Sequence, residues 1–290
     1  MYAADMAYNC TLAQWESNSR VLHAISKGNP EGPYQPQKVI VPIWAHNPTI
    51  HRSPDGHYAI YHIGQGKPYH TPITNCSKNY SQSQTNRELP AIGDEWPTSA
   101  NIAVSDNNNL DNFKEENSAS GNWAFNNPAV WIFENGTTLI VSKISCNASM
   151  NLNKSEFCAQ LVVSIAPSYK GPFKLVNYLN IYGEDPYIWQ DLNGYFHMIW
   201  QSGNYKGTPF MGPGHWHTAY SKDAYHWIPA NKTQAFDNNI KLTNGTVVNV
   251  GRRERHQILF NENGLPAYLF NGCGDNTFSF TSVQPMNTKS

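Results

Sequence analysis

The sequence of 290 residues has few charged residues, at 14%, and contains no long apolar run. Its 20 Lys and Arg balance 21 Asp and Glu, and basic residues gather only at Arg252, Arg253 and Arg255. Binding to nucleic acid or to an anionic membrane therefore has no electrostatic basis. Because a bilayer-spanning helix needs about 20 consecutive apolar residues, we expect no membrane segment.

Patterns that mark metal sites and amphipathic helices are also missing. The 11 histidines form no HxxxH or HExxH pattern, and the five cysteines form no CxxC pair. Zinc sites with these spacings are therefore excluded, and we expect no cofactor. The aromatic content, in contrast, is high at 13%, and Asn, Ser, Thr and Gly supply most of the polarity. This composition indicates a folded chain and not a disordered one.

The first residues lack the basic and apolar regions of a signal peptide, yet the interior resembles that of a secreted protein. Eight Asn-x-Ser/Thr sequons occur, above the roughly four to five that composition gives by chance. They begin at Asn9, Asn75, Asn79, Asn135, Asn147, Asn153, Asn231 and Asn244. We expect a secreted or endomembrane-lumen glycoprotein whose signal peptide is missing from this chain.

The cysteine count of five is odd, which suggests that one partner is missing. Cys146 and Cys158 flank a polar loop that a disulfide could close, as is common in secreted proteins. Five unpaired thiols in a cytosolic protein are the alternative interpretation.

Short alternating runs predict strands throughout, and one unit repeats along the chain. It consists of a short strand that opens with x-Pro, a polar turn with Gly, and an aromatic-rich strand. Copies start at positions 47, 127, 185 and 255, the last with His in place of Pro. A second repeat interleaves with the first at 24–34, 163–173 and 220–227. Together the repeats predict an all-β fold, a five-bladed β-propeller with four-stranded antiparallel blades.

We expect a single propeller domain over residues 1–290. The predicted blades are 1–40, 41–120, 121–178, 179–247 and 248–290. The outer-strand motif at 24–34 has no inner hairpin before it, so the first blade is expected to be incomplete at the N-terminus, its start lying upstream of Met1. A four-bladed protein with an irregular arm at 1–40 is the alternative.

In a propeller the inner strands line a central funnel, so the starts of these strands converge on one site. The positions concerned are Trp44, His46, Asn47, Trp123, Asn126, Asn127, Glu184, Asp185, Arg253, Glu254 and Arg255. Amides and carboxylates bind hydroxyl groups, and aromatic rings stack on sugar faces. The funnel is therefore predicted to bind a neutral polyhydroxylated ligand, a carbohydrate, and we expect a monomer without further partners.

These segments resemble those of the five-bladed propeller glycoside hydrolases of family 43, the arabinanase type. The run WAHNPTI with DGHYAIY, at 44–61, is similar to the second-blade motif of that family, and NNPAV with ENG, at 126–136, to the third. The run GEDPYIW with NGYFHMI, at 183–199, is similar to the fourth. The Glu-Asp-Pro triplet also resembles the Arg-Asp-Pro motif of the invertase-like family 32. The resemblance implies an inverting glycoside hydrolase that acts on a poly- or oligosaccharide.

The resemblance assigns catalytic roles to two residues, and a third candidate, Glu254, comes from its place at the start of the last blade. Glu184 corresponds to the general acid of family 43, and Asp185 to the stabilising aspartate of family 32. Because alternate strand residues face opposite sides, only one of them should point into the funnel unless the strand start is irregular. Glu254 is either an alternative acid, a sugar-binding carboxylate or part of a buried ion-pair cluster. The base of family 43 lies on the first inner strand, outside this chain.

The family's third-blade aspartate, which tunes the acid, corresponds to Asn127, and an amide cannot supply its charge. The predicted substrate-binding residues are Trp44, His46, Asn47, Trp123, Asn127, Trp189, Arg253 and Arg255. Trp15, Trp200 and Trp227 are expected in the blade cores. Some family 43 propellers hold an axial calcium near a last-blade histidine, here His256. The amides at two strand starts favour an alternative function, a non-catalytic carbohydrate-binding propeller.

Overall fold

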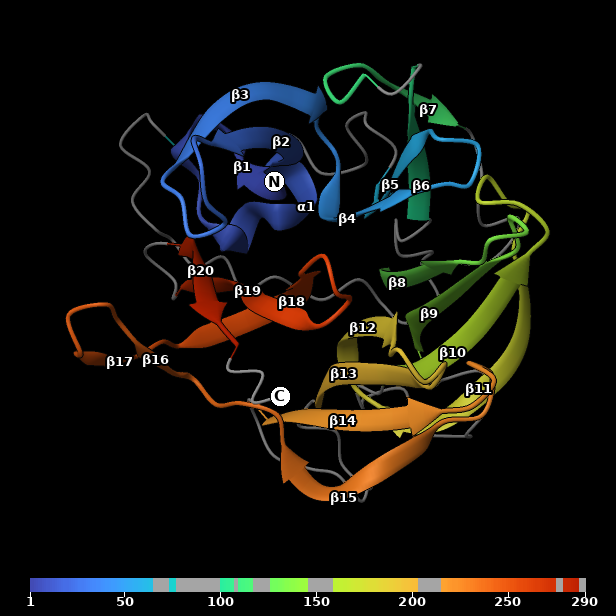
Figure 1. Ribbon diagram of the computed structural model, residues 1–290. Helices are drawn as coiled ribbons and strands as arrows, with labels where there is room; N and C mark the ends of the chain where they lie inside the picture. The colour runs from blue at the N-terminus through green and yellow to red at the C-terminus, as the bar shows by residue number, and fades with distance from the viewer. Residues whose placement is uncertain are drawn as a thin grey trace.

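The computed structural model describes residues 1–64, 73–76, 100–106, 109–116, 126–145, 159–202, 215–274 and 279–286. Five small antiparallel sheets stand in a ring around a central axis, as Figure 1 shows. The predicted all-β, five-bladed propeller is thus confirmed. None of the helices in the described ranges is long and apolar enough to cross a membrane.

The strands follow one another around the ring in chain order. Blade 1 consists of β1 (Tyr2–Met6), β2 (Ser19–Ser26) and β3 (Tyr34–Val41), and blade 2 of β4 (His46–Arg52), β5 (Tyr58–Ile63), β6 (Ala100–Ser105) and β7 (Phe113–Glu116). Blade 3 consists of β8 (Asn126–Ile132), β9 (Thr138–Ser145), β10 (Ala159–Ala166) and β11 (Lys174–Tyr182). Blade 4 consists of β12 (Glu184–Gln190), β13 (Phe196–Ser202), β14 (His215–Ser221) and β15 (Ile228–Gln234). Blade 5 consists of β18 (Arg252–Phe260), β19 (Pro266–Gly274) and β20 (Ser279–Pro285).

Blade 1 has three strands within the described residues, in agreement with the prediction that this blade is incomplete, whereas blade 5 also has three where four were predicted. The third sheet continues to Tyr182, although the predicted blade ended at 178. A separate hairpin, β16 (Asn239–Lys241) with β17 (Val247–Asn249), extends outward between blades 4 and 5 (Figure 1). The α-helix of the described residues, α1 (Trp15–Asn18), has only four residues and lies in blade 1.

The inner hairpins of blades 2 to 5 close with the same glycine turn. The glycines are Gly56, Gly136, Gly194 and Gly264, with φ between 73° and 91°. This left-handed region suits glycine because a side chain would clash with the backbone there. The repeated Gly in the sequence units therefore marks the turns that set each inner hairpin.

The core lies between neighbouring blades, because each sheet buries both of its faces. On β9, Leu139 and Val141 pack with Trp200 of blade 4, whereas Ile140 between them packs with Tyr61 of blade 2. Alternate residues of a strand point to opposite faces, so one strand contributes to two cores. Burying such a side chain contributes about 2 kcal/mol, and this packing holds the inner strands in place around the axis.

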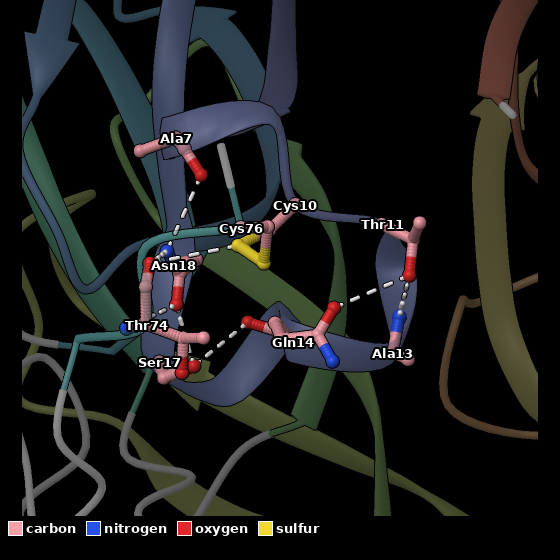
Figure 2. The surroundings of a disulfide bond; sticks show 9 residues. All are labelled: Ala7, Cys10, Thr11, Ala13, Gln14, Ser17, Asn18, Thr74 and Cys76. Atoms are coloured by element: carbon pink, nitrogen blue, oxygen red, sulfur yellow. Dashed lines mark hydrogen bonds between the residues drawn. A yellow bond between two sulfur atoms is a disulfide. The ribbon is translucent and has the colours of Figure 1, made fainter. Parts of the chain in front are cut away.

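A disulfide joins Cys10 of blade 1 to Cys76, which follows β5 of blade 2 (Figure 2). Beside it, the Asn18 amide donates to the Thr74 carbonyl at 2.7 Å, and the Thr74 backbone N–H donates back to Asn18 Oδ1 at 3.1 Å. These contacts tie blades 1 and 2 together. The spacing of cysteines does not determine their connectivity, so the sequence could not give this pair.

The disulfide predicted between Cys146 and Cys158 lies outside the described residues. Cys273, at the end of β19, is a buried free thiol, and its Sγ lies 3.3 Å from the Ser282 hydroxyl.

Candidate active site

The inner strands of blades 2 to 5 share one irregularity at their starts. The first residue of each repeat unit has a left-handed backbone, with φ of 52° to 54°, and the strand pairing shifts register there. The four residues are Asn47, Asn127, Asp185 and Arg255. Asn and Asp tolerate this conformation better than most residues, which explains their recurrence before proline in the sequence.

Because of this bulge, neighbouring residues at a strand start do not simply alternate between faces. Both Glu184 and Asp185 line a cavity of about 1020 Å³ on the propeller axis. Regular alternation would have allowed only one of them to do so. His46, Asn47, Asn127, Glu254 and Arg255 also line this cavity, as the sequence predicted. A cavity of this size accommodates a ligand larger than a single sugar.

The four left-handed residues are linked by hydrogen bonds from blade to blade. The Asn47 amide donates to Asn127 Oδ1 at 2.8 Å, which joins blades 2 and 3. The Arg255 guanidinium donates to Asp185 Oδ1 at 3.1 Å, and its backbone N–H donates to Asp185 Oδ2 at 3.2 Å, which joins blades 5 and 4. Arg255 also donates to the Asn47 carbonyl at 3.2 Å. One arginine thus connects three blades around the cavity.

Glu184 forms an ion pair with Lys143, a residue that the sequence analysis missed. Lys143 Nζ lies 2.6 Å from Glu184 Oε2, and both side chains are at most one-third exposed. Lys143 lies on β9, where it pairs in register with Asn126 at the start of the neighbouring strand β8. Lys143 lies on the second strand of its blade, and only the pairing register brings it to the cavity. The sequence around it therefore does not indicate that it belongs to the site.

Glu254 is a carboxyl group that holds a proton near neutral pH. Burial, followed by the nearby charges of Asp185 and Glu184, raises its pKa from 4.5 to about 7, although Arg252 and Arg255 act in the opposite direction. A group of this kind can donate a proton to a leaving group at neutral pH. This agrees with the sequence-based alternative that Glu254 is an acid, and it makes Glu254 a candidate proton donor.

His46 is a neutral group beside these charges. Burial and the charge of Arg255 lower its pKa to about 3, so the imidazole is uncharged at physiological pH. Its Nδ1 lies 2.7 Å from the Ser19 hydroxyl, and its ring lies 5.0 Å from that of Trp15. The neutral ring can hydrogen-bond a ligand but supplies no charge to the cavity.

The tryptophans follow the prediction only in part. Trp200 and Trp227 are 1% and 9% exposed and belong to the core between blades 3 and 4, as expected. Trp15, also expected in a core, is half-buried and lines the cavity. Trp44, predicted to bind substrate, is 1% exposed and donates its Nε1–H to the Trp15 carbonyl, so its ring faces the interior. Trp123 lies outside the described residues.

Trp189 lines the cavity far from the carboxyl groups. It is five residues after Glu184 on β12, and a strand rises about 3.3 Å per residue, so the two are separated by roughly 16 Å. Its ring stacks on His197 at 5.2 Å and packs against the core between blades 4 and 5. Trp189 therefore belongs to the opposite end of the axial cavity.

Arg253, also predicted to bind substrate, is buried within blade 5. It is 2% exposed, donates to Asn271 Oδ1 at 3.0 Å and to the Asp237 carbonyl at 2.9 Å, and lies 4.3 Å from the Phe236 ring. It points to the other face of β18 from Arg252 and Glu254, because adjacent strand residues alternate. The prediction for Arg253 is therefore corrected: it stabilises the blade and does not line the cavity.

The calcium that the family resemblance suggested does not fit the residues present. His256 is buried, its Nε2 lies 3.0 Å from the Ile199 carbonyl oxygen, and burial lowers its pKa to about 3. Calcium requires six to eight oxygen ligands, and an imidazole supplies none of them. Within the described ranges, no group of three His, Cys, Asp or Glu side chains could hold a metal. We therefore assign no chemistry to a metal.

No protein-family model matches this sequence, and no curated protein matches it. Solved structures, however, share its fold. Zg3597, a family 117 glycoside hydrolase from the marine bacterium Zobellia galactanivorans, aligns with a TM-score of 0.56 at 12% identity, over 91% of this chain and 69% of its own. A thermostable family-43 glycoside hydrolase aligns with a TM-score of 0.56 at 10% identity, over 94% of this chain and 83% of its own.

A third similar structure is 1,3Gal43A, an exo-beta-1,3-galactanase from Clostridium thermocellum. It aligns with a TM-score of 0.51 at 14% identity, over all of this chain and 57% of its own. At these identities the likeness establishes the shared five-bladed propeller fold. The motif resemblance to family 43 thus pointed to the correct architecture.

Proposed function

We propose that this protein is a glycoside hydrolase that cleaves an oligo- or polysaccharide, with Glu254 as the proton donor. The observation that carries the proposal is the largely buried Glu254 in a cavity with the ion-paired carboxyl groups of Glu184 and Asp185; burial and these two neighbours raise the pKa of Glu254 to about 7. Most glycosidases use one protonated and one ionised carboxyl group at the same site. The glycoside hydrolase neighbours support the same class of reaction, since they share the fold.

In the proposed reaction, Glu254 gives its proton to the glycosidic oxygen as the bond from that oxygen to the anomeric carbon breaks. A water molecule forms the new bond to the anomeric carbon and passes a proton to Glu184, whose charge Lys143 balances. In this proposal Glu184 acts as the base, whereas the family 43 resemblance assigned it the role of the general acid. A direct displacement inverts the anomeric configuration, which NMR of the first-formed product can test.

The test is hydrolysis of a panel of aryl glycosides and plant or algal oligosaccharides by the wild type and by Glu254→Gln and Glu184→Gln. We expect Glu254→Gln to lower kcat by about 10²–10⁴-fold on natural substrates. Its loss should be much smaller with dinitrophenyl glycosides, whose leaving group needs no protonation. Glu184→Gln should lose activity on both kinds of substrate, because water activation is needed in each case.

Glu116→Gln is the matched control, because Glu116 is an exposed glutamate paired with Lys170, outside the cavity. Equal losses of Glu254→Gln on good and poor leaving groups would remove Glu254 from the acid role. If no protein in the series turns over any substrate but sugar binding is retained, the alternative of a non-catalytic carbohydrate-binding propeller replaces the proposal.

A further inference from the structure

Some ionisable side chains of the axial cavity form ion pairs and others do not. Its lining contains the cations Lys143, Arg252 and Arg255 and the carboxyl groups of Asp5, Glu184, Asp185 and Glu254. Ion pairs form between Glu184 and Lys143 at 2.6 Å, Asp185 and Arg255 at 3.1 Å, and Asp5 and Arg20 at 2.6 Å. In this part of the cavity, three carboxylates thus already have a cationic partner.

Arg252 and Glu254 are the two ionisable residues of this set that form none of these ion pairs. They lie two residues apart on β18 and both line the cavity, as expected for one face of a strand. Arg252 is exposed, and within the described residues it makes no ion pair with a carboxylate. Whenever Glu254 holds its proton, the guanidinium of Arg252 is therefore an unbalanced positive charge beside the candidate proton donor.

We propose that the cavity recognises an acidic sugar, one that carries a carboxylate or a sulfate ester, through the guanidinium of Arg252. The inference rests on the proposed function and names its substrate class. It differs from the neutral ligand expected from the sequence, because residue types at the strand starts did not show which charges pair. A guanidinium binds carboxylate and sulfate oxygens through two parallel N–H groups, which a neutral hydroxyl cannot match.

Such a substrate would also assist the proposed reaction. The groups that face Glu254 are Glu184 and Asp185, which raise its pKa, and Arg252 and Arg255, which lower it. An anionic sugar bound to Arg252 adds negative charge next to Glu254 and offsets the effect of this arginine. Glu254 then keeps its proton at higher pH, where the acid would otherwise ionise.

The experiment measures binding by calorimetry to the full chain with Glu254→Gln, which mimics the protonated acid and prevents turnover. The probes are matched pairs: tri-galacturonate with its methyl ester, and a sulfated galactan oligosaccharide with its desulfated form. We expect at least one acidic member to bind about tenfold more tightly than its neutral partner, a difference typical of a charge-assisted contact. The two pairs distinguish carboxylate from sulfate recognition.

Adding Arg252→Gln to Glu254→Gln should abolish the preference for the acidic form. The ratio of the affinities for the acidic and the neutral member of each pair measures this loss of preference. Lys170→Gln removes an exposed cation outside the cavity and should leave the ratio unchanged. Equal affinity for both members of each pair, no binding of any acidic probe, or a preference that survives Arg252→Gln overturns the inference.

The experiments distinguish failure of the acidic substrate class from failure of the proposed function. If the wild type hydrolyses neutral glycosides and shows no acidic preference, the proposed function stands and the acidic substrate class is wrong. If an Arg252-dependent preference exists but nothing is hydrolysed, the charge recognition stands and the glycosidase assignment is wrong.

Discussion

Blades 2 and 3 present the same backbone to the axis as blades 4 and 5, but with different chemistry. The strand starts are His46-Asn47 and Asn126-Asn127 in the first pair of blades, the neutral half, and Glu184-Asp185 and Glu254-Arg255 in the second, the charged half. The left-handed bulge is the same in all four. The fold therefore determines where these side chains lie. The residue types at the four strand starts place the candidate acid and the candidate base on blades 5 and 4.

The two halves are also held together differently. Within the neutral half, the direct link across the axis is an amide hydrogen bond between Asn47 and Asn127, and blade 2 is joined to blade 1 by the Cys10–Cys76 disulfide. Within the charged half, the link is the ion pair of Arg255 and Asp185, whose side chains are 16% and 6% exposed. Removing one link at a time tests how much each contributes.

The largest expected effect is loss of the disulfide. The double variant Cys10→Ser, Cys76→Ser should lower the free energy of unfolding by about 4 kcal/mol, because the bond closes a loop of 66 residues in the unfolded chain. Urea denaturation of the oxidised protein provides the measurement. Cys273→Ser, which removes the free thiol, is the control, and it should respond to dithiothreitol as the wild type does. Insensitivity of the wild type to dithiothreitol would contradict the pairing.

The second-largest effect is expected when Asp185 of the charged half is replaced by asparagine, the residue type at the equivalent positions of the neutral half. Asp185→Asn should lower the free energy of unfolding by about 3 kcal/mol, because Arg255 is left buried without its carboxylate. Denaturant unfolding measures the loss, and Asp106→Asn, the same substitution at an exposed aspartate 4.0 Å from Lys114, is the control. A loss below about 1 kcal/mol would mean that the ion pair contributes no more than an exposed one.

The sequence predicted the inner strands because their signal is local. An Asn or Asp followed by Pro, and then a Gly turn, recurs at the inner strands of blades 2, 3 and 4 and is readable without tertiary information, whereas blade 5 keeps only the Gly turn and has Arg255 and His256 in place of the pair. What depends on register could not be predicted. Lys143 reaches Glu184 only because it pairs with Asn126, and the bulge on β18 decides that Arg255 faces the cavity while Arg253 does not.

A third prediction concerns pH. Since the pKa of Glu254 is raised to about 7 in the folded state, the folded protein binds a proton more readily than the unfolded chain. The stability that this provides is full below about pH 4.5 and is lost as the pH rises to about 7. Relative to Glu254→Gln, the wild type should lose about 3 kcal/mol between pH 4.5 and pH 8 in urea denaturation. Parallel curves for the two proteins would show that Glu254 ionises normally.

The smallest effect tests whether the bulge is the same in both halves. Ala is disfavoured in a left-handed backbone by about 1 kcal/mol relative to Gly, after allowance for the greater freedom of Gly in the unfolded chain. Asn127→Ala should thus be about 1 kcal/mol less stable than Asn127→Gly, although both lose the hydrogen bond to Asn47. The pair Asp185→Ala and Asp185→Gly should differ by the same amount, because φ is 53° and 54° at the two positions. Both Asp185 variants lack the ion pair with Arg255, and each pair of variants cancels the lost side-chain contacts. A smaller difference at Asp185 would therefore mean that the left-handed backbone at this position depends on the ion pair, whereas the backbone at Asn127 keeps its conformation without the side chain.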